Sequence, residues 1–168
     1  MVHSIELLFD RDTEAAIRAL WADLAAAPIA GRAPAGRPHV TLIAAERIAP
    51  EVDALLRPVS QRLPLGCAVG ASVLFGRPGA VLARLIVPTA GLLALHAEVH
   101  LVSGPYLTAA MPNSLPDKWT AHVTLARRIG EPHVGQAVRI AGRPAELRGS
   151  LAGLRRWDGN QRTEQVIN

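Results

Sequence analysis

This sequence is poor in cysteine and in long apolar runs, and each shortage excludes a class of protein. Cys67 is the only cysteine in 168 residues, so a disulfide framework and a cysteine-rich zinc site are both excluded. No stretch approaches the roughly 18 apolar residues of a membrane-spanning helix. Glu6 and Asp10 stand where a signal peptide would be apolar. We therefore expect a cytoplasmic protein with no membrane association, and Cys67 as a buried small hydrophobe.

Lysine and aromatic residues are also scarce. Lys118 is the only lysine, arginine supplies the remaining basic charge, and the formal net charge is +4 with a pI near 10.5. Positive charge favours an anionic partner. The few aromatic residues do not cluster with basic ones, as they do in proteins that follow a long nucleic-acid strand. We therefore expect a small phosphate ligand or an RNA end.

Hydrophobic periodicity and turn residues predict alternating strands and helices. The first half is predicted to contain a strand at 3–10, a helix at 12–27 capped by Asp12 or Thr13, a proline-rich loop at 28–38, a strand at 39–46, a helix at 50–62, and an extended segment at 63–75 broken at its glycines. After a turn at 76–79, the second half is predicted to contain a strand at 81–88, a helix at 89–102, a proline-rich loop, a strand at 119–128, a helical piece at 131–140, and strands at 146–157 and 163–168. The same order of elements occurs twice.

An identical tetrapeptide anchors this duplication. His39-Val40-Thr41-Leu42 recurs as His122-Val123-Thr124-Leu125, at an offset of 122 − 39 = 83 residues. That period is about half of the chain and is too long for a solenoid repeat. It predicts one domain over 1–168 with two related lobes, at about 1–78 and 79–168, between which strands are free to exchange.

The repeated motif places chemically useful groups on one face of each strand. Because side chains alternate along a strand, His39 and Thr41 share a face, as do His122 and Thr124. Lobes packed with approximate twofold symmetry would bring both pairs to one cleft. There, a neutral imidazole can accept a proton from the attacking oxygen while an imidazolium protonates the leaving oxygen. The threonine hydroxyls can donate to the non-bridging oxygens of a phosphodiester.

The paired H-x-T-L elements, spaced in this way in a chain of this length, resemble the 2H phosphoesterase superfamily. The resemblance is closest to its 2′-5′ RNA ligase-like branch, the RNA 2′,3′-cyclic phosphodiesterases. It extends along nearly the whole chain, because GRPGAVLARLIVPTAGLLALHAEV (76–99) is similar to the mid-chain strand and helix of that branch.

The resemblance implies an α+β class: a bilobal duplicated fold with antiparallel sheets lining a central groove and helices on the outside. It implies catalysis by His39 and His122 without a metal or cofactor, and phosphate binding by Thr41 and Thr124. The second motif continues as HVTLAR, so Arg127 matches a basic residue of the branch and is a further phosphate-binding candidate, whereas the first motif has Ala44 at that offset.

Several residues near the motifs are further candidates. Trp119 is the preferred candidate for stacking on a base, ahead of Tyr106 and of Phe75, for which core packing is favoured. Arg37 and Arg128 are candidates for the rim of the groove. Alternation predicts that Arg127 and Arg128 point to opposite faces, so they do not both reach the ligand.

The sequence therefore predicts an enzyme that hydrolyses a 2′,3′-cyclic phosphate on an RNA 3′ end or a small nucleotide. The resemblance favours a 2′-phosphate product and allows weak 2′-5′ RNA ligation in reverse. We expect a monomer with no obligate protein partner. The near-symmetry of the two motifs does not indicate which histidine is the acid.

Three alternatives remain open from the sequence. The first is a non-catalytic protein that binds RNA ends or nucleotides, and the second is an enzyme of this class acting on another small phosphodiester. The third is a metal site at His96 and His100, four residues apart on a helix, although no third ligand is evident. A solvated helix surface is favoured for that pair, and His3 and His133 are expected at the surface.

Overall fold

The first half of the chain follows the predicted order. The computed structural model describes residues 2–76 and 79–168, so the predicted turn at 76–79 lies partly outside the described residues. The elements are β1 (His3–Phe9), α1 (Arg11–Ala26), β2 (His39–Ile48), α2 (Val52–Ser60) and β3 (Leu65–Phe75). The cap of α1 is Asp10, whose side chain accepts a hydrogen bond from the Thr13 backbone N–H, so the prediction of Asp12 or Thr13 as cap was wrong.

The second half repeats this order with two additions. Its elements are β4 (Ala80–Ile86), α3 (Ala90–Ser103), β5 (Leu107–Ala110), β6 (His122–Ile129), α4 (Val134–Ala141), β7 (Leu147–Asp158) and β8 (Thr163–Ile167). The predicted proline-rich loop contains the short strand β5, which pairs with the end of β2. The segment predicted as two strands at 63–75 is one strand, β3, with an irregularity between Val69 and Ser72.

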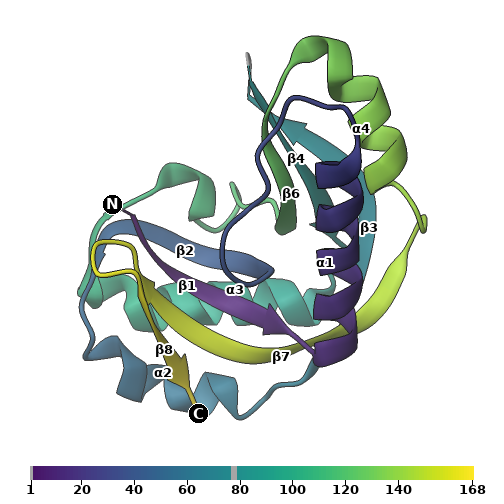
Figure 1. Cartoon of the computed structure of the whole chain (residues 1–168). Coiled ribbons are helices and arrows are strands. Elements are labelled where there is room, and N and C mark those ends of the chain that lie inside the picture. The colour runs from purple at the N-terminus through teal and green to yellow at the C-terminus, as the bar shows by residue number, and fades with distance from the viewer. Residues whose placement is uncertain (1, 77–78) are drawn as a thin grey trace.

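The antiparallel α+β architecture predicted from the sequence is confirmed, with the strands joined in one sheet. The strand order is β5-β2-β1-β7-β3-β4-β6, and β8 pairs with β7. β7 pairs with β1 and also with β3, so the last long strand of the second half connects both groups of strands. In Figure 1, β1, β2 and β7 run across the lower part of the molecule, while β4 and β6 rise above them.

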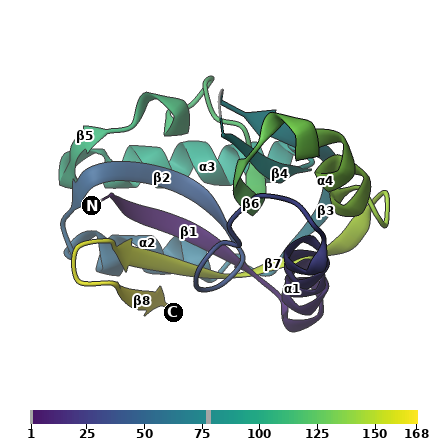
Figure 2. The same ribbon diagram turned by 45° about the horizontal axis from the view of Figure 1, so that its top comes forward.

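The helices pack across the two halves of the chain. α1 lies beside α4 at one end of the molecule, and both contact β6 (Figures 1 and 2). α2 packs against α3, and α3 contacts β2. The motif strand β2 of the first half is therefore supported by α3 of the second half, and the motif strand β6 of the second half by α1 of the first half.

Among the described residues, no helix combines the length and apolar character that crossing a bilayer requires. Cys67 is buried within β3, as predicted, and burial raises the pKa of its thiol to about 11. The thiol is therefore held in its neutral form and packs as a small apolar group.

A fully buried arginine links the neighbouring strands β3 and β4 to the chain that precedes β7. Arg84 in β4 has no exposed surface. Its guanidinium donates hydrogen bonds to the backbone carbonyls of five residues: Val69, Gly70, Ala141, Pro144 and Ala145. The planar group carries five N–H donors, so this set of acceptors uses its full capacity. Arg84 thereby connects β3, the end of α4 and the segment before β7.

We predict that Arg84→Met lowers the free energy of unfolding by at least about 3 kcal/mol, because each buried carbonyl left without a hydrogen bond costs roughly 1 to 3 kcal/mol. Chemical denaturation measures the change. Arg148→Met is the matched control, since the Arg148 side chain is 86% exposed, and it should change stability by less than about 0.5 kcal/mol. Equal stability of the two variants would contradict this role for Arg84.

Candidate active site

The two copies of the HVTL motif line one pocket of about 300 Å³. β2 and β6 contact each other, although β6 ends the strand order and β2 lies near its other end. The pocket contains the predicted residues His39, Thr41, His122, Thr124, Arg127 and Trp119. Residues assigned from the two motifs therefore converge in a single cavity, at the lower end of the size range of small-ligand sites.

Both motif histidines are oriented by the same local hydrogen bond. The Nδ1 atom of His39 lies 2.8 Å from the carbonyl oxygen of Arg37, and that of His122 lies 2.6 Å from the carbonyl oxygen of Thr120. A carbonyl oxygen only accepts, so Nδ1 carries the hydrogen in each ring. In the neutral form, Nε2 then holds the free lone pair, and in the protonated form it is a second donor. Nε2 is therefore the nitrogen available for proton transfer in both copies.

A β-bulge follows the threonine of each motif. β1 pairs Ile5 with Ile43 and Glu6 with Thr41, which leaves Leu42 as an extra residue in β2. The pairing of β4 with β6 skips Leu125 in the same way. A bulge shifts the alternation of side chains by one residue. The duplication therefore includes this irregularity of the backbone as well as the four identical residues.

The second bulge explains why Arg127 reaches the pocket. Regular alternation from His122 and Thr124 would place Arg128 on the pocket face and Arg127 on the opposite face. After the bulge, Arg127 lines the pocket together with Thr124. Arg128 has a φ of 59° beside a second irregularity and is not among the residues that line the pocket. The first motif has Ala44 in the corresponding place, so only the second motif supplies a cation at this position.

Two tryptophans hold the threonine carbonyls of the motifs. The indole N–H of Trp119 donates to the carbonyl oxygen of Thr41 at 2.8 Å, and that of Trp21 in α1 donates to the carbonyl oxygen of Thr124 at 3.0 Å. Burying a carbonyl without a partner is costly, so these bonds stabilise the two motif strands. This role of Trp21 could not be predicted from the sequence, because a tryptophan on a helix gives no signal of a bond to a distant strand.

Trp119 is already stacked on one side. Its ring lies parallel to that of His96, at an angle of 4° and a centroid separation of 3.9 Å. A base could use only the opposite face of the indole. Arg37 bonds to Glu14 at 2.8 Å and is absent from the pocket lining.

His96 and His100 support β2 from behind. Nε2 of His96 lies 3.1 Å from the carbonyl oxygen of Leu42, and Nε2 of His100 lies 3.3 Å from the same atom. His96 is 3% exposed, so the prediction of a solvated helix surface is wrong for it. Burial lowers the pKa of both imidazoles, and the nearby His100 lowers that of His96 further. Because these nitrogens face carbonyl oxygens, they act as N–H donors and lack the lone pair of a metal ligand.

No group of three or more histidine, cysteine, aspartate or glutamate residues within 2–76 and 79–168 could hold a metal ion. The helix pair His96 and His100 has no third ligand.

The surroundings of the two motif histidines differ in charge. Glu6 lies opposite Thr41 in β1, and its Oε1 atom is 3.5 Å from Nε2 of His39. Ala83 occupies the corresponding position opposite Thr124 in β4. Burial lowers the pKa of His122, and the positive charges of His39 and Arg127 lower it further, against a raising effect of its bond to the Thr120 carbonyl. His122 is therefore held in its neutral form more readily than a free imidazole.

Several pocket residues were not assigned by the sequence analysis. Phe75 lies against His122, with ring centroids 4.7 Å apart and an interplanar angle of 50°. Core packing was favoured for this residue, but its ring lines the pocket. The pocket also includes Val81, Asn113, Ser114 and Lys118, of which Lys118 adds a second cation. Asn113, Ser114 and Lys118 belong to the segment before β6, which carries no motif from which their contacts could be predicted.

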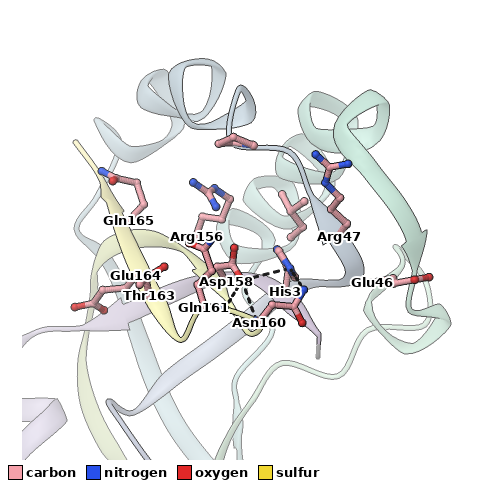
Figure 3. Close-up of a pocket in the computed structure, with 12 residues that line it drawn as sticks. His3, Glu46, Arg47, Arg156, Asp158, Asn160, Gln161, Thr163, Glu164 and Gln165 are labelled. Carbon is pink, nitrogen blue, oxygen red and sulfur yellow. Dashed lines mark hydrogen bonds and ion pairs between the residues drawn. The ribbon is translucent and has the colours of Figure 1, made fainter.

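A larger cavity of about 740 Å³ lies at the other end of β1 and contains neither motif (Figure 3). His3, expected at the surface, is 5% exposed there and lies 3.5 Å from Asp158. Arg156 is held by two hydrogen bonds to Asp53. These charged groups already have partners within the protein, so this cavity is a weaker candidate for a phosphate site.

We predict that His122 titrates below about 6.5, the value of an unperturbed imidazole, in an NMR titration. Arg127→Gln removes a positive charge from the pocket and should raise the pKa of His122. Arg128→Gln, which removes the adjacent charge outside the pocket, is the control and should leave that pKa unchanged. A His122 pKa above 6.5, or equal effects of the two variants, would contradict the electrostatics described above.

Comparison with known proteins agrees with the motif. A comparison with curated protein sequences finds no match. Among solved structures, the chain is similar to Usb1 of Kluyveromyces marxianus, with a TM-score of 0.56 and 11% identity over 99% of this chain and 97% of that one. A second structure of that protein, with uridine monophosphate, gives a TM-score of 0.54 with the same identity and coverage. At this identity the likeness shows the fold alone.

The family match covers most of the chain and includes both motifs. The model of the 2′-5′ RNA ligase superfamily matches residues 9–161. Formation or cleavage of a phosphodiester bond is the chemistry of such a superfamily. This chain belongs to the 2′-5′ RNA ligase superfamily.

Proposed function

We propose that this protein hydrolyses a 2′,3′-cyclic phosphate, on an RNA 3′ end or a small nucleotide, to a phosphomonoester. The observation that carries the proposal is the arrangement of His39 and His122, which line one pocket with Nδ1 engaged and Nε2 available. Two such imidazoles supply an acceptor and a donor of protons without a metal. Membership of the superfamily supports phosphodiester chemistry at this site.

The proposed reaction needs one proton transfer at each side of the phosphorus. A neutral imidazole accepts a proton from water as its oxygen attacks phosphorus, and an imidazolium protonates the ribose oxygen as its bond to phosphorus breaks. The hydroxyls of Thr41 and Thr124 donate to the non-bridging oxygens, where negative charge develops. Arg127 adds positive charge from the side of β6.

The charge difference between the motifs supports an assignment of roles. Burial, together with the charges of His39 and Arg127, lowers the pKa of His122, which suits a general base that must begin neutral. His39 has the Glu6 carboxylate 3.5 Å from Nε2, so negative charge lies beside the nitrogen that would donate a proton, an arrangement that suits a general acid. Family resemblance favours the 3′ oxygen as leaving group and a 2′-phosphate product. The reverse reaction, in which a 5′-hydroxyl attacks the cyclic phosphate, would be a minor 2′-5′ ligation.

The size and composition of the pocket support a small substrate. A volume of about 300 Å³ suits a terminal nucleotide, and Lys118 and Arg127 provide cations for its phosphate. The open face of Trp119 is the proposed stacking surface for a base. Both motifs come from the same chain, so a monomer contains the whole proposed site.

We predict that His39→Ala and His122→Ala each abolish nearly all turnover of a nucleoside 2′,3′-cyclic phosphate while the fold is retained. Thr41→Ala and Thr124→Ala should each cost about 1 to 3 kcal/mol of transition-state stabilisation, because each removes one hydrogen bond to a developing charge. The double histidine variant should lose little more than either single variant, since both groups serve one step. Steady-state kinetics and circular dichroism measure these effects, and full activity of either histidine variant would refute the assignment.

We predict that turnover survives an excess of chelator and follows a bell-shaped dependence on pH. The two limbs belong to the coupled pair of imidazoles, because activity requires one neutral and one protonated ring. His96→Ala with His100→Ala is not a clean control for a metal site, because it removes the partners of the Leu42 carbonyl and would disturb β2. Loss of turnover on chelation, restored by a divalent cation, would instead support a metal-dependent reaction.

A further inference from the structure

We propose that Glu6 is a positioning residue that holds the reactive proton on Nε2 of His39, and that Arg155 fixes Glu6 for this task. The proposal rests on the proposed function, because it adds a third group to the acid side of that reaction. Glu6 lies in β1, outside both motifs, and is 3% exposed in a strand that is buried along its whole length. A carboxylate in such a place needs partners, and each oxygen of Glu6 has them.

One oxygen of Glu6 faces the site. Oε1 lies 3.5 Å from Nε2 of His39 and accepts a hydrogen bond from the Ser4 hydroxyl at 2.5 Å. A separation of 3.5 Å is longer than a direct N–H···O bond. The carboxylate is therefore close enough to stabilise an imidazolium through charge, yet the Nε2 hydrogen is not committed to Glu6 and can pass to a substrate oxygen.

The other oxygen of Glu6 is fixed by Arg155. Oε2 accepts a hydrogen bond from Nε of Arg155 at 2.7 Å and forms an ion pair with Nη2 of the same residue at 2.6 Å. Arg155 is 5% exposed and also contacts Glu164, which lines the larger cavity (Figure 3). Burial lowers the pKa of Arg155, but the two carboxylates raise it more, so the guanidinium stays charged. The charged guanidinium holds Oε2 in place and so prevents rotation of the Glu6 carboxylate away from His39.

The position of Glu6 favours an acid role for His39 over a base role. In a serine protease triad, the carboxylate bonds Nδ1 and leaves Nε2 free to accept a proton. Here, Nδ1 of His39 bonds the Arg37 carbonyl, and the carboxylate lies beside Nε2 itself. Negative charge at the reacting nitrogen stabilises the proton there before it is transferred.

The Glu6 carboxylate is what distinguishes the surroundings of His39 from those of His122. The other charged or titratable side chains that line its pocket are His122, Arg127 and Lys118, of which the last two are cations. Arg37 lies two residues before His39, and its guanidinium donates hydrogen bonds to the Glu14 carboxylate. Glu6 is therefore the group that brings negative charge close to the Nε2 atom of His39. His122 has Ala83 where His39 has Glu6.

The test compares two substrates that differ in the leaving atom. One is a nucleoside 2′,3′-cyclic phosphate, and the other is its analogue with sulfur in place of the leaving ribose oxygen, prepared as both the 2′ and the 3′ isomer. A thiolate departs without a proton, because its pKa of about 8.5 is far below that of a ribose hydroxyl. Glu6→Gln keeps the shape of the side chain and leaves Arg155 its contact with Glu164.

We expect Glu6→Gln to lower kcat on the oxygen substrate by about 10- to 100-fold with little change in KM, as for the loss of general acid catalysis. On the sulfur analogue that is cleaved by the wild-type protein, the loss should shrink to less than about threefold, because no proton is needed. Asp53→Asn is the matched control. It weakens the contact of a different carboxylate with an arginine of β7, Arg156, away from His39, and should leave kcat unchanged on both substrates.

The outcomes separate this proposal from the proposed function. If the wild-type protein does not cleave any 2′,3′-cyclic phosphate, the proposed function fails. If the wild-type protein cleaves the cyclic phosphate but Glu6→Gln is as active as Asp53→Asn, the role of Glu6 is refuted while the function stands. Equal losses of kcat on oxygen and sulfur substrates would also overturn the proposal, because they would show a general disturbance of the site.

Discussion

The candidate site depends on the meeting of two strands that lie far apart in one antiparallel sheet. β2 lies near one end of the strand order and β6 at the other, so the pocket forms only because the sheet curves enough to bring them into contact. β7 makes this possible by pairing with β1 on one side and β3 on the other. Helices from opposite halves then support the motif strands, since α1 contacts β6 and α3 contacts β2.

The two halves of the site share their backbone but differ in their electrostatics. Each motif has the same bulge, the same Nδ1 contact to a carbonyl two residues earlier, and an indole N–H on its threonine carbonyl. Outside the motif the sides diverge, because one has Glu6 and the other has Ala83 and Arg127. A phosphodiester is attacked from one side and leaves from the other, so this difference suits a directed reaction better than full symmetry would.

The sequence was sufficient for the features that depend on local pattern. The repeated tetrapeptide selected His39, Thr41, His122 and Thr124 as candidates, which line one pocket, and periodicity placed most strands and helices. Arg127 came from family resemblance, because alternation alone would have selected Arg128, and a bulge cannot be read from side-chain identity. Long-range contacts were missed for the same reason: the bonds of Trp21, His96 and Arg84 join segments that are distant in sequence. Glu6 could have been noticed in the sequence, because it is the single acidic residue in an otherwise largely apolar strand.

The central claim is that both motifs bind one phosphate, and a crystal structure with a nucleoside 2′-monophosphate tests it most directly. The account predicts the phosphate in the smaller pocket, within hydrogen-bond distance of Nε2 of both His39 and His122 and of at least one motif threonine hydroxyl. Binding of the phosphate in the larger cavity beside His3, or contact with only one of the two motif histidines, would contradict it.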